Sequence, residues 1–314
     1  MTNAIRIISG SAHPAFAEKI CQKIGVSLCQ TEVVRFSNEN ILVQVEENVR
    51  ETDVFVIQPS CSPVSDGLVE LLITIDTLKH ASARRITAVL PYFPYVRSDK
   101  KDRPRISISA RLMADLLETA GANRVLTMDL HSPQVQGFFR IPSDQLAAAP
   151  ILCDHLRETR DLADYVLVAG DVGEAKEIGG YANRLNLPIA VVDKRRDGHD
   201  EKPRAVNLIG DIEGKRALLI DDEIASGGTL MEATAFLLDR GAVSVEAAAV
   251  HPVLSGQSVS RIAESPLQSV VVTDTIPLPV EKQIDKIEVC SVAGLFADAI
   301  KAIHDGSSIS GLFR

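Results

Sequence analysis

A short loop near residue 225 carries the clearest chemistry in this sequence. The apolar run 217–220 leads into Asp221 and Asp222, and after Ile224 come five small residues: Ala225, Ser226, Gly227, Gly228 and Thr229. Glycines let backbone N–H groups approach an anion closely, and the start of the following helix supplies more of them. Adjacent carboxylates can accept hydrogen bonds from sugar hydroxyls. The pattern predicts a sugar-phosphate site. The alternative is a plain strand–helix turn capped by Thr229, which the repulsion between two adjacent acids disfavours.

Two more predicted strand ends carry groups suited to a metal or a phosphate. Asp129 and His131 stand two residues apart, so they could share one face of a strand and hold a Mg²⁺–nucleotide. Asp171 follows the apolar run 166–169, and Mg²⁺ takes one or two carboxylates together with substrate phosphate oxygens. The alternatives are a core or capping role for the histidine and a helix cap for Asp171.

Basic residues bunch in two loops of an otherwise acidic chain. Arg97, Ser98 and Asp99 open a run that continues with two lysines, and this run could grip the phosphates of a nucleotide. Lys194 and Arg196 follow the apolar run 189–192, where a pair of cations could close over a reacting phosphoryl group and neutralise its developing charge. A solvated surface run is the alternative for both.

Composition excludes several other functions. The 314 residues have a formal net charge of −9, without the basic stripe that neutralises nucleic-acid phosphates. The five cysteines are scattered with no CxxC pair, which argues against a zinc site or a disulfide framework and fits a reducing cytosol. No apolar run approaches ~18 residues and no signal pattern is present, so a soluble cytoplasmic protein without membrane contact is expected. The sequence has neither a Walker A loop nor a GxGxxG fingerprint.

Short β-branched runs alternate with longer amphipathic stretches, which predicts an α/β fold with mainly parallel sheets. Strands are expected at 5–9, 53–58, 85–90, 124–130, 165–169, 189–192, 217–220, 244–250 and 269–272, with a hairpin at 32–36 and 41–45. Helices are expected at 14–23, 67–80, about 109–120, 174–185, 230–240 and 293–304. Ser107 or Ser109 would cap the third helix and Gly121 would end it. The chemical residues fall beyond predicted strand ends, where open α/β sheets bind ligands.

The chain resembles the ribose-phosphate pyrophosphokinase (phosphoribosyl pyrophosphate synthetase) family over essentially its whole length. The matching stretches are Pro91-Tyr-Phe-Pro-Tyr-Val-Arg97, Met128-Asp-Leu-His131, Gln136-Gly-Phe-Phe139, Asp193-Lys-Arg-Arg196, the loop from Asp221 to Thr229, and Thr273-Asp-Thr-Ile-Pro277. The Asp-Asp loop alone is shared with the wider type I phosphoribosyltransferase fold, so the ordered set of matches points to the narrower family.

The resemblance implies two type I phosphoribosyltransferase-like domains, each a mainly parallel sheet flanked by helices, with ATP and Mg²⁺ held between them. The first would cover 1–147 and be joined by the C-terminal helix within 293–314. The second would cover 148–292 and carry the ribose 5-phosphate loop. The implied reaction moves the pyrophosphoryl group of ATP to the C1 hydroxyl of ribose 5-phosphate and releases AMP, in a homo-oligomer with the ATP site near a subunit interface.

Position within the family also assigns the site residues. The resemblance implies ATP binding by Phe36, Asn38, Asn40, Arg97, Ser98, Asp99 and His131, with the hairpin at 36–40 reaching the ATP of a neighbouring subunit. It implies metal ligation by His131 and Asp171 and catalysis by Lys194 and Arg196. The ribose 5-phosphate residues would be Asp221, Asp222, Ala225, Ser226, Gly227, Gly228 and Thr229.

Some of these positions depart from the family pattern. Asn38 and Asn40 stand where acids are usual, Ser98 where Gln is usual, and Ala225 where an acid is usual. Glu174 replaces the second Gly after Asp171. These changes bear on nucleotide choice, on regulation by phosphate or ADP, and on rate.

Two alternative functions stay open from the sequence. A non-catalytic paralogue that regulates an active synthetase is disfavoured because it need not keep Lys194 and Arg196. A phosphoribosyltransferase that consumes the product is disfavoured because it has no use for the ATP-side residues Arg97 and His131.

Overall fold

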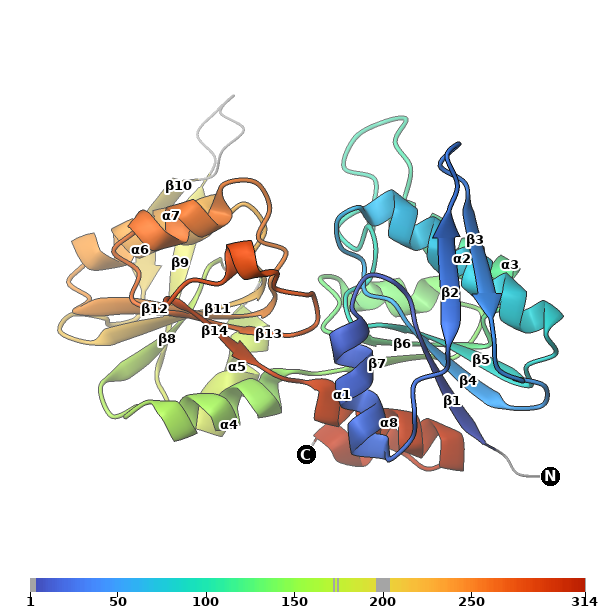
Figure 1. Ribbon diagram of the computed structural model, residues 1–314. Helices are drawn as coiled ribbons and strands as arrows, with labels where there is room; N and C mark the ends of the chain where they lie inside the picture. Colours follow the sequence, from blue (N-terminus) through green and yellow to red (C-terminus); the bar gives the residue numbers. More distant parts are fainter. Residues whose placement is uncertain (1–3, 172, 174, 196–203, 314) are drawn as a thin grey trace. The chain divides into compact units, whose positions relative to one another are not determined.

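The computed structural model describes residues 4–171, 173, 175–195 and 204–313, which divide into two compact units (Figure 1). Unit 1 comprises Met1–Ala147, Thr275–Pro277 and Ser291–Arg314. Unit 2 comprises Ala148–Asp274 and Leu278–Cys290. A mainly parallel sheet flanked by helices forms each unit, so the predicted α/β class is confirmed.

Unit 1 contains a five-stranded parallel sheet in the order β1-β4-β5-β6-β7. Its strands are β1 (Ile5–Ser9), β4 (Asp53–Ile57), β5 (Arg85–Leu90), β6 (Arg124–Met128) and β7 (Ser143–Leu146). Helices α1 (Pro14–Ile24) and α8 (Ala293–Asp305) lie together on one face, while α2 (Val64–His80) and α3 (Ser109–Ala120) cover the other (Figure 1). Strands β2 (Thr31–Arg35) and β3 (Ile41–Val45) form a separate hairpin. Short 3-10 helices are η1 (Pro133–Phe138) and η3 (Ile309–Phe313).

Unit 2 contains a seven-stranded sheet in the order β10-β9-β8-β11-β12-β13-β14, antiparallel only between β10 and β9. Its strands are β8 (Tyr165–Ala169), β9 (Ile189–Arg195), β10 (Arg204–Ile209), β11 (Arg216–Glu223), β12 (Ser244–His251), β13 (Val270–Thr273) and β14 (Ile287–Cys290). Its helices are α4 (Ala149–Thr159), α5 (Ala175–Leu185), α6 (Gly228–Asp239) and α7 (Ser258–Glu264), with the short 3-10 helix η2 (Val280–Lys282).

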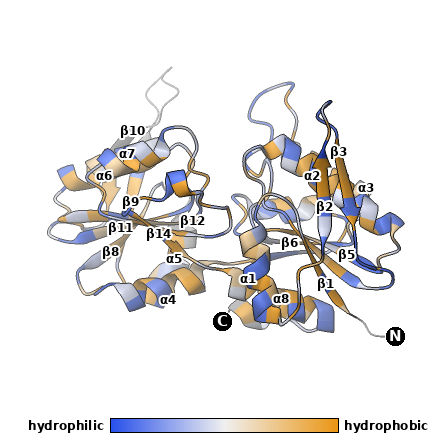
Figure 2. Ribbon diagram, in the orientation of Figure 1, coloured by the Kyte–Doolittle hydropathy of each residue, from blue (hydrophilic) through white to orange (hydrophobic). Residues whose placement is uncertain are grey.

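The central strands carry the cores of both units. Every residue of β4, β8 and β12 is buried, as expected for parallel strands covered by helices on both faces. The hydropathy colouring shows the same pattern, with apolar strands and amphipathic helices around them (Figure 2). Among the described helices, none combines the length and the apolar character needed to cross a membrane.

Three local predictions were wrong. Strand β11 continues through Asp221 and Asp222, because its pairing with β12 extends to Glu223 and His251. Strand β6 ends at Met128, and Asp129 has a φ of +34°, so Asp129 and His131 do not share the face of one strand. Neither serine caps α3, whose N-cap residue is Ile108. The predicted stop of this helix at Gly121, with a φ of +121°, is confirmed.

A partly buried ion cluster joins three parts of unit 2. Arg160, which follows α4 and is 10% exposed in its side chain, donates to Glu246 on β12 at 3.1 Å and to Glu288 on β14 at 2.5 and 2.8 Å. Tyr165 and Ser269 also donate their hydroxyl hydrogens to Glu246. The hydrogen bonds from Arg160 hold the pKa of Glu288 below its usual value of 4.5.

We expect Arg160→Met to lower the free energy of unfolding by about 2 kcal/mol, because it leaves the buried Glu246 and the partly exposed Glu288 without their shared cation. Urea unfolding at pH 7 measures this. The control is Lys215→Met. The i,i+4 ion pair of Lys215 with Asp211 is more exposed, so its loss should lower the free energy of unfolding by less than about 1 kcal/mol. Because the pKa of Glu288 is lowered in the folded protein, the stabilisation is present above pH 4.5 and is lost as the pH falls through the lower folded value. A difference between wild type and Arg160→Met that stayed constant from pH 7 to 3 would contradict this account.

Candidate active site

Three neighbouring strands of unit 2 bring predicted chemical residues to one edge of the sheet. Strand β8 leads to Asp171, β9 contains Lys194, and β11 contains Asp221 and Asp222. Because β8 lies between β9 and β11 and pairs in parallel with both, the three carboxyl ends point the same way. This is the edge at which parallel α/β sheets bind ligands.

Strand β9 projects beyond its neighbour at this edge. Its pairing with β8 stops at Val191, opposite Ala169, yet β9 continues to Arg195 with β10 as its remaining partner. The backbone of Lys194 pairs with Ala205 in this projecting hairpin. Arg196 lies outside the described residues. The hairpin therefore carries the backbone of Lys194 past the end of β8, on the side where Asp171 follows.

The two adjacent acids of β11 do not share one side of the sheet. Successive side chains of a strand point to opposite faces, and Asp222 donates its backbone N–H to Asp221 Oδ1 at 2.9 Å. Asp221 lines a small, mostly apolar pocket together with Gly170 and Thr229, whereas Asp222 does not line it. Of the two acids, Asp221 is therefore the one that faces this pocket.

The loop after β11 leads directly into α6. Gly227 is the N-cap residue of this helix with a left-handed φ of +75°, so Thr229 does not cap it and stands in the first turn. The N–H groups of a first helical turn have no acceptor within the helix, and the helix dipole adds positive potential there. The end of α6 is therefore suited to an anion, as the Gly-Gly-Thr pattern indicated.

Asp171 is a half-buried carboxylate that accepts a hydrogen bond from the N–H of Gly173 at 2.7 Å. It belongs to unit 2, whereas His131 is an exposed residue of unit 1. Within the described residues, no three His, Cys, Asp or Glu side chains gather into a cage for a metal ion. Mg²⁺ does not need such a cage, because it is commonly bound by one or two carboxylates together with substrate phosphates and water.

In unit 1, Ser98 closes the loop that contains the predicted ATP residues. Its hydroxyl donates to the carbonyl of Ser107 at 3.3 Å and accepts the N–H of Ser109 at 3.2 Å. Its own carbonyl accepts the N–H of Ala110 at 3.1 Å. Ser98 therefore accepts hydrogen bonds from two N–H groups at the start of α3. The sequence had suggested that Ser107 or Ser109 would cap this helix. Arg97 is exposed and Asp99 half-buried on this closed loop.

The tip of the β2–β3 hairpin is a compact turn. The Oδ1 atom of Asn38 accepts the N–H of Asn40 at 3.2 Å, and the N–H of Phe36 donates to the carbonyl of Asn40 at 2.9 Å. The Phe36 side chain remains 48% exposed. An ion pair of 2.6 Å between Arg35 and Asp66 fastens the hairpin to α2. Asn38 thus shapes the turn through the oxygen that an aspartate would also provide.

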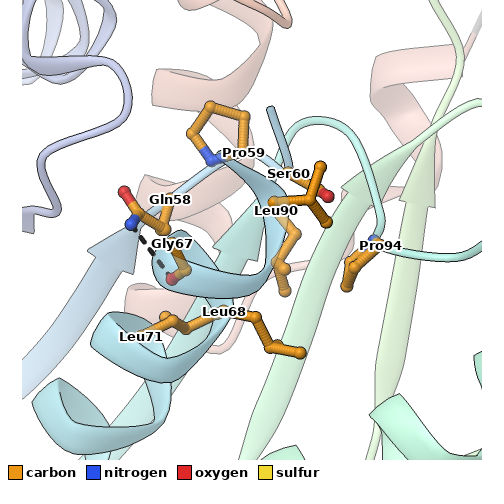
Figure 3. A pocket seen from close by; sticks show the side chains of 9 residues that line it. Gln58, Pro59, Ser60, Gly67, Leu68, Leu71, Leu90 and Pro94 are labelled. Carbon is orange, nitrogen blue, oxygen red and sulfur yellow. Dashed lines mark hydrogen bonds between the residues drawn. The ribbon is translucent and has the colours of Figure 1, made fainter. Parts of the chain in front are cut away.

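A second pocket, of about 200 Å³, lies in unit 1 after β4 and β5 (Figure 3). Its lining is mostly apolar and contains none of the predicted site residues. Both ends of the Gln58 amide are used within the protein. Its Nε2 donates to the carbonyl of Gly67 at 3.2 Å (Figure 3), and its Oε1 accepts the N–H of Ala12 at 3.1 Å. With no acid, base or cation in its wall, this pocket does not offer phosphoryl chemistry.

Thiol chemistry is disfavoured at four of the five cysteines. Cys21, Cys29, Cys153 and Cys290 are buried, and burial raises the pKa of each thiol to about 11. These side chains are protonated at neutral pH, so they pack as small apolar groups and do not act as nucleophiles.

We expect Gly227→Ala to weaken the binding of ribose 5-phosphate about fivefold or more, because a left-handed φ of +75° costs an alanine about 1 kcal/mol and the loop shifts to relieve it. Isothermal titration calorimetry with the sugar phosphate measures this. Gly214→Ala is the matched control, since Gly214 has a similar φ of +71°, has open space around its Cβ position, and precedes the other end of β11. Equal affinities for the two variants would argue against an anion site at Gly227.

Comparisons with known proteins agree with this geometry. A family model for the N-terminal domain of ribose phosphate pyrophosphokinase matches residues 5–121, and one for the phosphoribosyl synthetase-associated domain matches 196–314. The ribose-phosphate pyrophosphokinase of Caldanaerobacter subterraneus subsp. tengcongensis is 49% identical over 99% of this chain and 98% of its own length. That of Corynebacterium ammoniagenes is 46% identical over 100% and 98%. The crystal structure of phosphoribosylpyrophosphate synthetase from Mycobacterium smegmatis superposes with a TM-score of 0.91 at 39% identity, covering 96% of this chain and 99% of the other. The chain therefore belongs to the ribose-phosphate pyrophosphokinase family.

Proposed function

We propose that this protein transfers the pyrophosphoryl group of ATP to the C1 hydroxyl of ribose 5-phosphate, giving phosphoribosyl pyrophosphate and AMP. The observation that carries the proposal is the shared carboxyl edge of β8, β9 and β11 in unit 2. This edge combines an anion-binding loop, an acid facing a pocket, a carboxylate suited to a metal, and a lysine on a projecting hairpin. Family membership supports the same reaction.

The sugar phosphate is assigned to the loop and pocket after β11. The N–H groups of residues 225–229 bind the 5-phosphate, and Asp221 accepts hydrogen bonds from the sugar hydroxyls. Asp222 belongs to the same acid pair but lies on the opposite face of the strand, so we assign it a supporting role at the strand end. Ala225 has no acidic group, so it does not deprotonate the attacking hydroxyl.

The chemical step is an in-line displacement at the β-phosphorus of ATP. The C1 oxygen of the sugar forms the new bond to phosphorus, the bond from that phosphorus to the α–β bridging oxygen breaks, and AMP leaves with the electron pair. The proton of the C1 hydroxyl is released to solvent water. Lys194 and Arg196 stabilise the negative charge that develops on the phosphoryl oxygens. Positioning and electrostatics carry most of the rate, since the protein forms no covalent bond to the substrate.

Mg²⁺ is the cofactor that we propose, with Asp171 of unit 2 as a residue that would hold it, and the resemblance assigns a metal role to His131 of unit 1 as well. When bound, the ion neutralises triphosphate charge and polarises the phosphoryl oxygens. Arg97, Asp99 and His131 are assigned to ATP. Ser98, which the resemblance also assigned to ATP, acts there by holding the loop of Arg97 and Asp99 in shape.

A homo-oligomer is part of the proposal because of the β2–β3 hairpin. Phe36 and Leu42 of this hairpin are 48% and 41% exposed, so both side chains are accessible to a second copy of the chain. We assign this hairpin, with Asn38 and Asn40 at its tip, to contact with the ATP bound by a second copy of the chain.

We expect phosphorus NMR of the protein with ATP, ribose 5-phosphate and Mg²⁺ to show AMP growing together with a pyrophosphoryl ester of the sugar. Excess EDTA should stop both signals and added Mg²⁺ should restore them, because the triphosphate charge must be neutralised for attack. Unchanged spectra at high protein and phosphate concentrations would refute an autonomous enzyme and favour a regulatory partner of an active synthetase.

We expect Lys194→Ala to lower kcat by about a hundredfold or more, because it removes a cation from the transition-state charge. The oligomer mass and the KM for both substrates should stay close to wild type. Arg195→Ala is the control, since it removes the same charge from the neighbouring residue of the same hairpin. A kcat for Lys194→Ala within about threefold of the wild type would exclude the catalytic role assigned to this lysine.

A further inference from the structure

The ribose 5-phosphate loop is fastened to the segment that follows β12. Three successive carbonyls of the loop accept hydrogen bonds from this segment. The N–H of Leu254 donates to Ile224 at 2.8 Å, and the N–H of Ser255 donates to Ala225 at 3.0 Å. The guanidinium of Arg261, through Nη1, donates to the carbonyl of Ser226 at 2.9 Å. Two of these bonds are made by backbone, whereas the third depends on one side chain.

These carbonyl contacts set the direction of the loop's N–H groups. In a trans peptide the C=O and the following N–H point in opposite directions across the same plane. When the carbonyls of Ile224, Ala225 and Ser226 point toward the 254–261 segment, the N–H groups of the next three residues point away from it. The loop therefore presents three N–H groups on the side opposite to the fastening segment.

The Ser226–Gly227 peptide is the one most in need of this restraint. Gly227 has a φ of +75°, and glycine crosses between backbone regions that other residues avoid. Rotation of this peptide would turn the Ser226 carbonyl toward the bound phosphate in place of an N–H. The bond from Arg261 opposes that rotation. The same guanidinium nitrogen would lie 3.9 Å from a Cβ built on Gly228, so its charge also stands beside the start of α6.

We propose that Arg261 is a positioning residue for ribose 5-phosphate, which holds the Ser226–Gly227 peptide with its N–H directed at the 5-phosphate. The inference rests on the proposed function of this loop. Arg261 lies on α7, a helix that the resemblance does not connect with the site, and we assign its effect to its contact with the loop backbone.

The test compares Arg261→Met with Arg261→Lys. We expect Arg261→Met to raise the KM for ribose 5-phosphate about fivefold while the KM for ATP stays within about twofold, because one charge-assisted hydrogen bond to the loop is lost. Arg261→Lys keeps a cationic donor and should recover most of the affinity. Calorimetric titration with ribose 5-phosphate alone should give the weakest binding for Arg261→Met and an affinity close to wild type for Arg261→Lys. An unchanged KM and an unchanged affinity in Arg261→Met would overturn the proposal.

Lys286→Met separates positioning from the stability of α7. Lys286 donates through Nζ to the carbonyls of Ile262, Ala263 and Ser265 at the other end of this helix, at 2.7–3.3 Å. This variant should lower the melting temperature and leave the KM for ribose 5-phosphate unchanged. If both variants raised that KM equally, loosening of α7 would explain the effect and the positioning role would be wrong.

Calorimetry also distinguishes a failure of this inference from a failure of the proposed reaction, because it measures the binding of the sugar phosphate without turnover. A wild type that turns over and an Arg261→Met variant that binds the sugar phosphate equally well would refute only the role of Arg261. A wild type that binds ribose 5-phosphate more tightly than Arg261→Met without any turnover would refute the reaction and support the role of Arg261.

Discussion

Parallel backbone pairing of β8 with β9 on one side and β11 on the other is the constraint on which the candidate site depends. It aligns three strand ends at one edge, and the register then decides how far each chain runs past its neighbour. A slip of one residue in β11 would turn Asp221 away from its pocket, since side chains alternate between faces. Every residue of β8 is buried, so a slip of the neighbouring strand β11 would disturb the packing of the core and is costly. The packing of the core therefore fixes which side chains lie at this edge of the sheet.

The proposed phosphate loop, residues 225–229, contains no charged side chain. Its residues contribute N–H groups, and the direction of those groups is set by carbonyl contacts made elsewhere in unit 2. Since Ala225 offers no carboxylate, the loop repels the phosphate less than an acidic loop would and provides no base. The charge stabilisation in the proposed reaction therefore falls on Lys194 and Arg196 and on the bound metal.

In unit 1, short polar side chains are used within their own loops. The Ser98 hydroxyl joins the beginning and end of the segment before α3, and Asn38 closes the hairpin turn. Each of these side chains makes a hydrogen bond that shapes the backbone of its own loop. The neighbouring charged residues, Arg97 and Asp99, lie on the loop whose shape the Ser98 hydrogen bonds define.

The sequence by itself determined the α/β class, most strand positions, the family, and the residue types at the site, because apolar periodicity and ordered motifs are local properties of the chain. Tertiary structure decided which of two adjacent acids lines the pocket, because that depends on the pairing of β11 with β12. It also decided that Ser98 serves α3 and that Arg261 reaches the phosphate loop. These contacts join residues 11 and 35 positions apart, and no local pattern encodes which distant carbonyl or N–H group a side chain will meet once the core has packed.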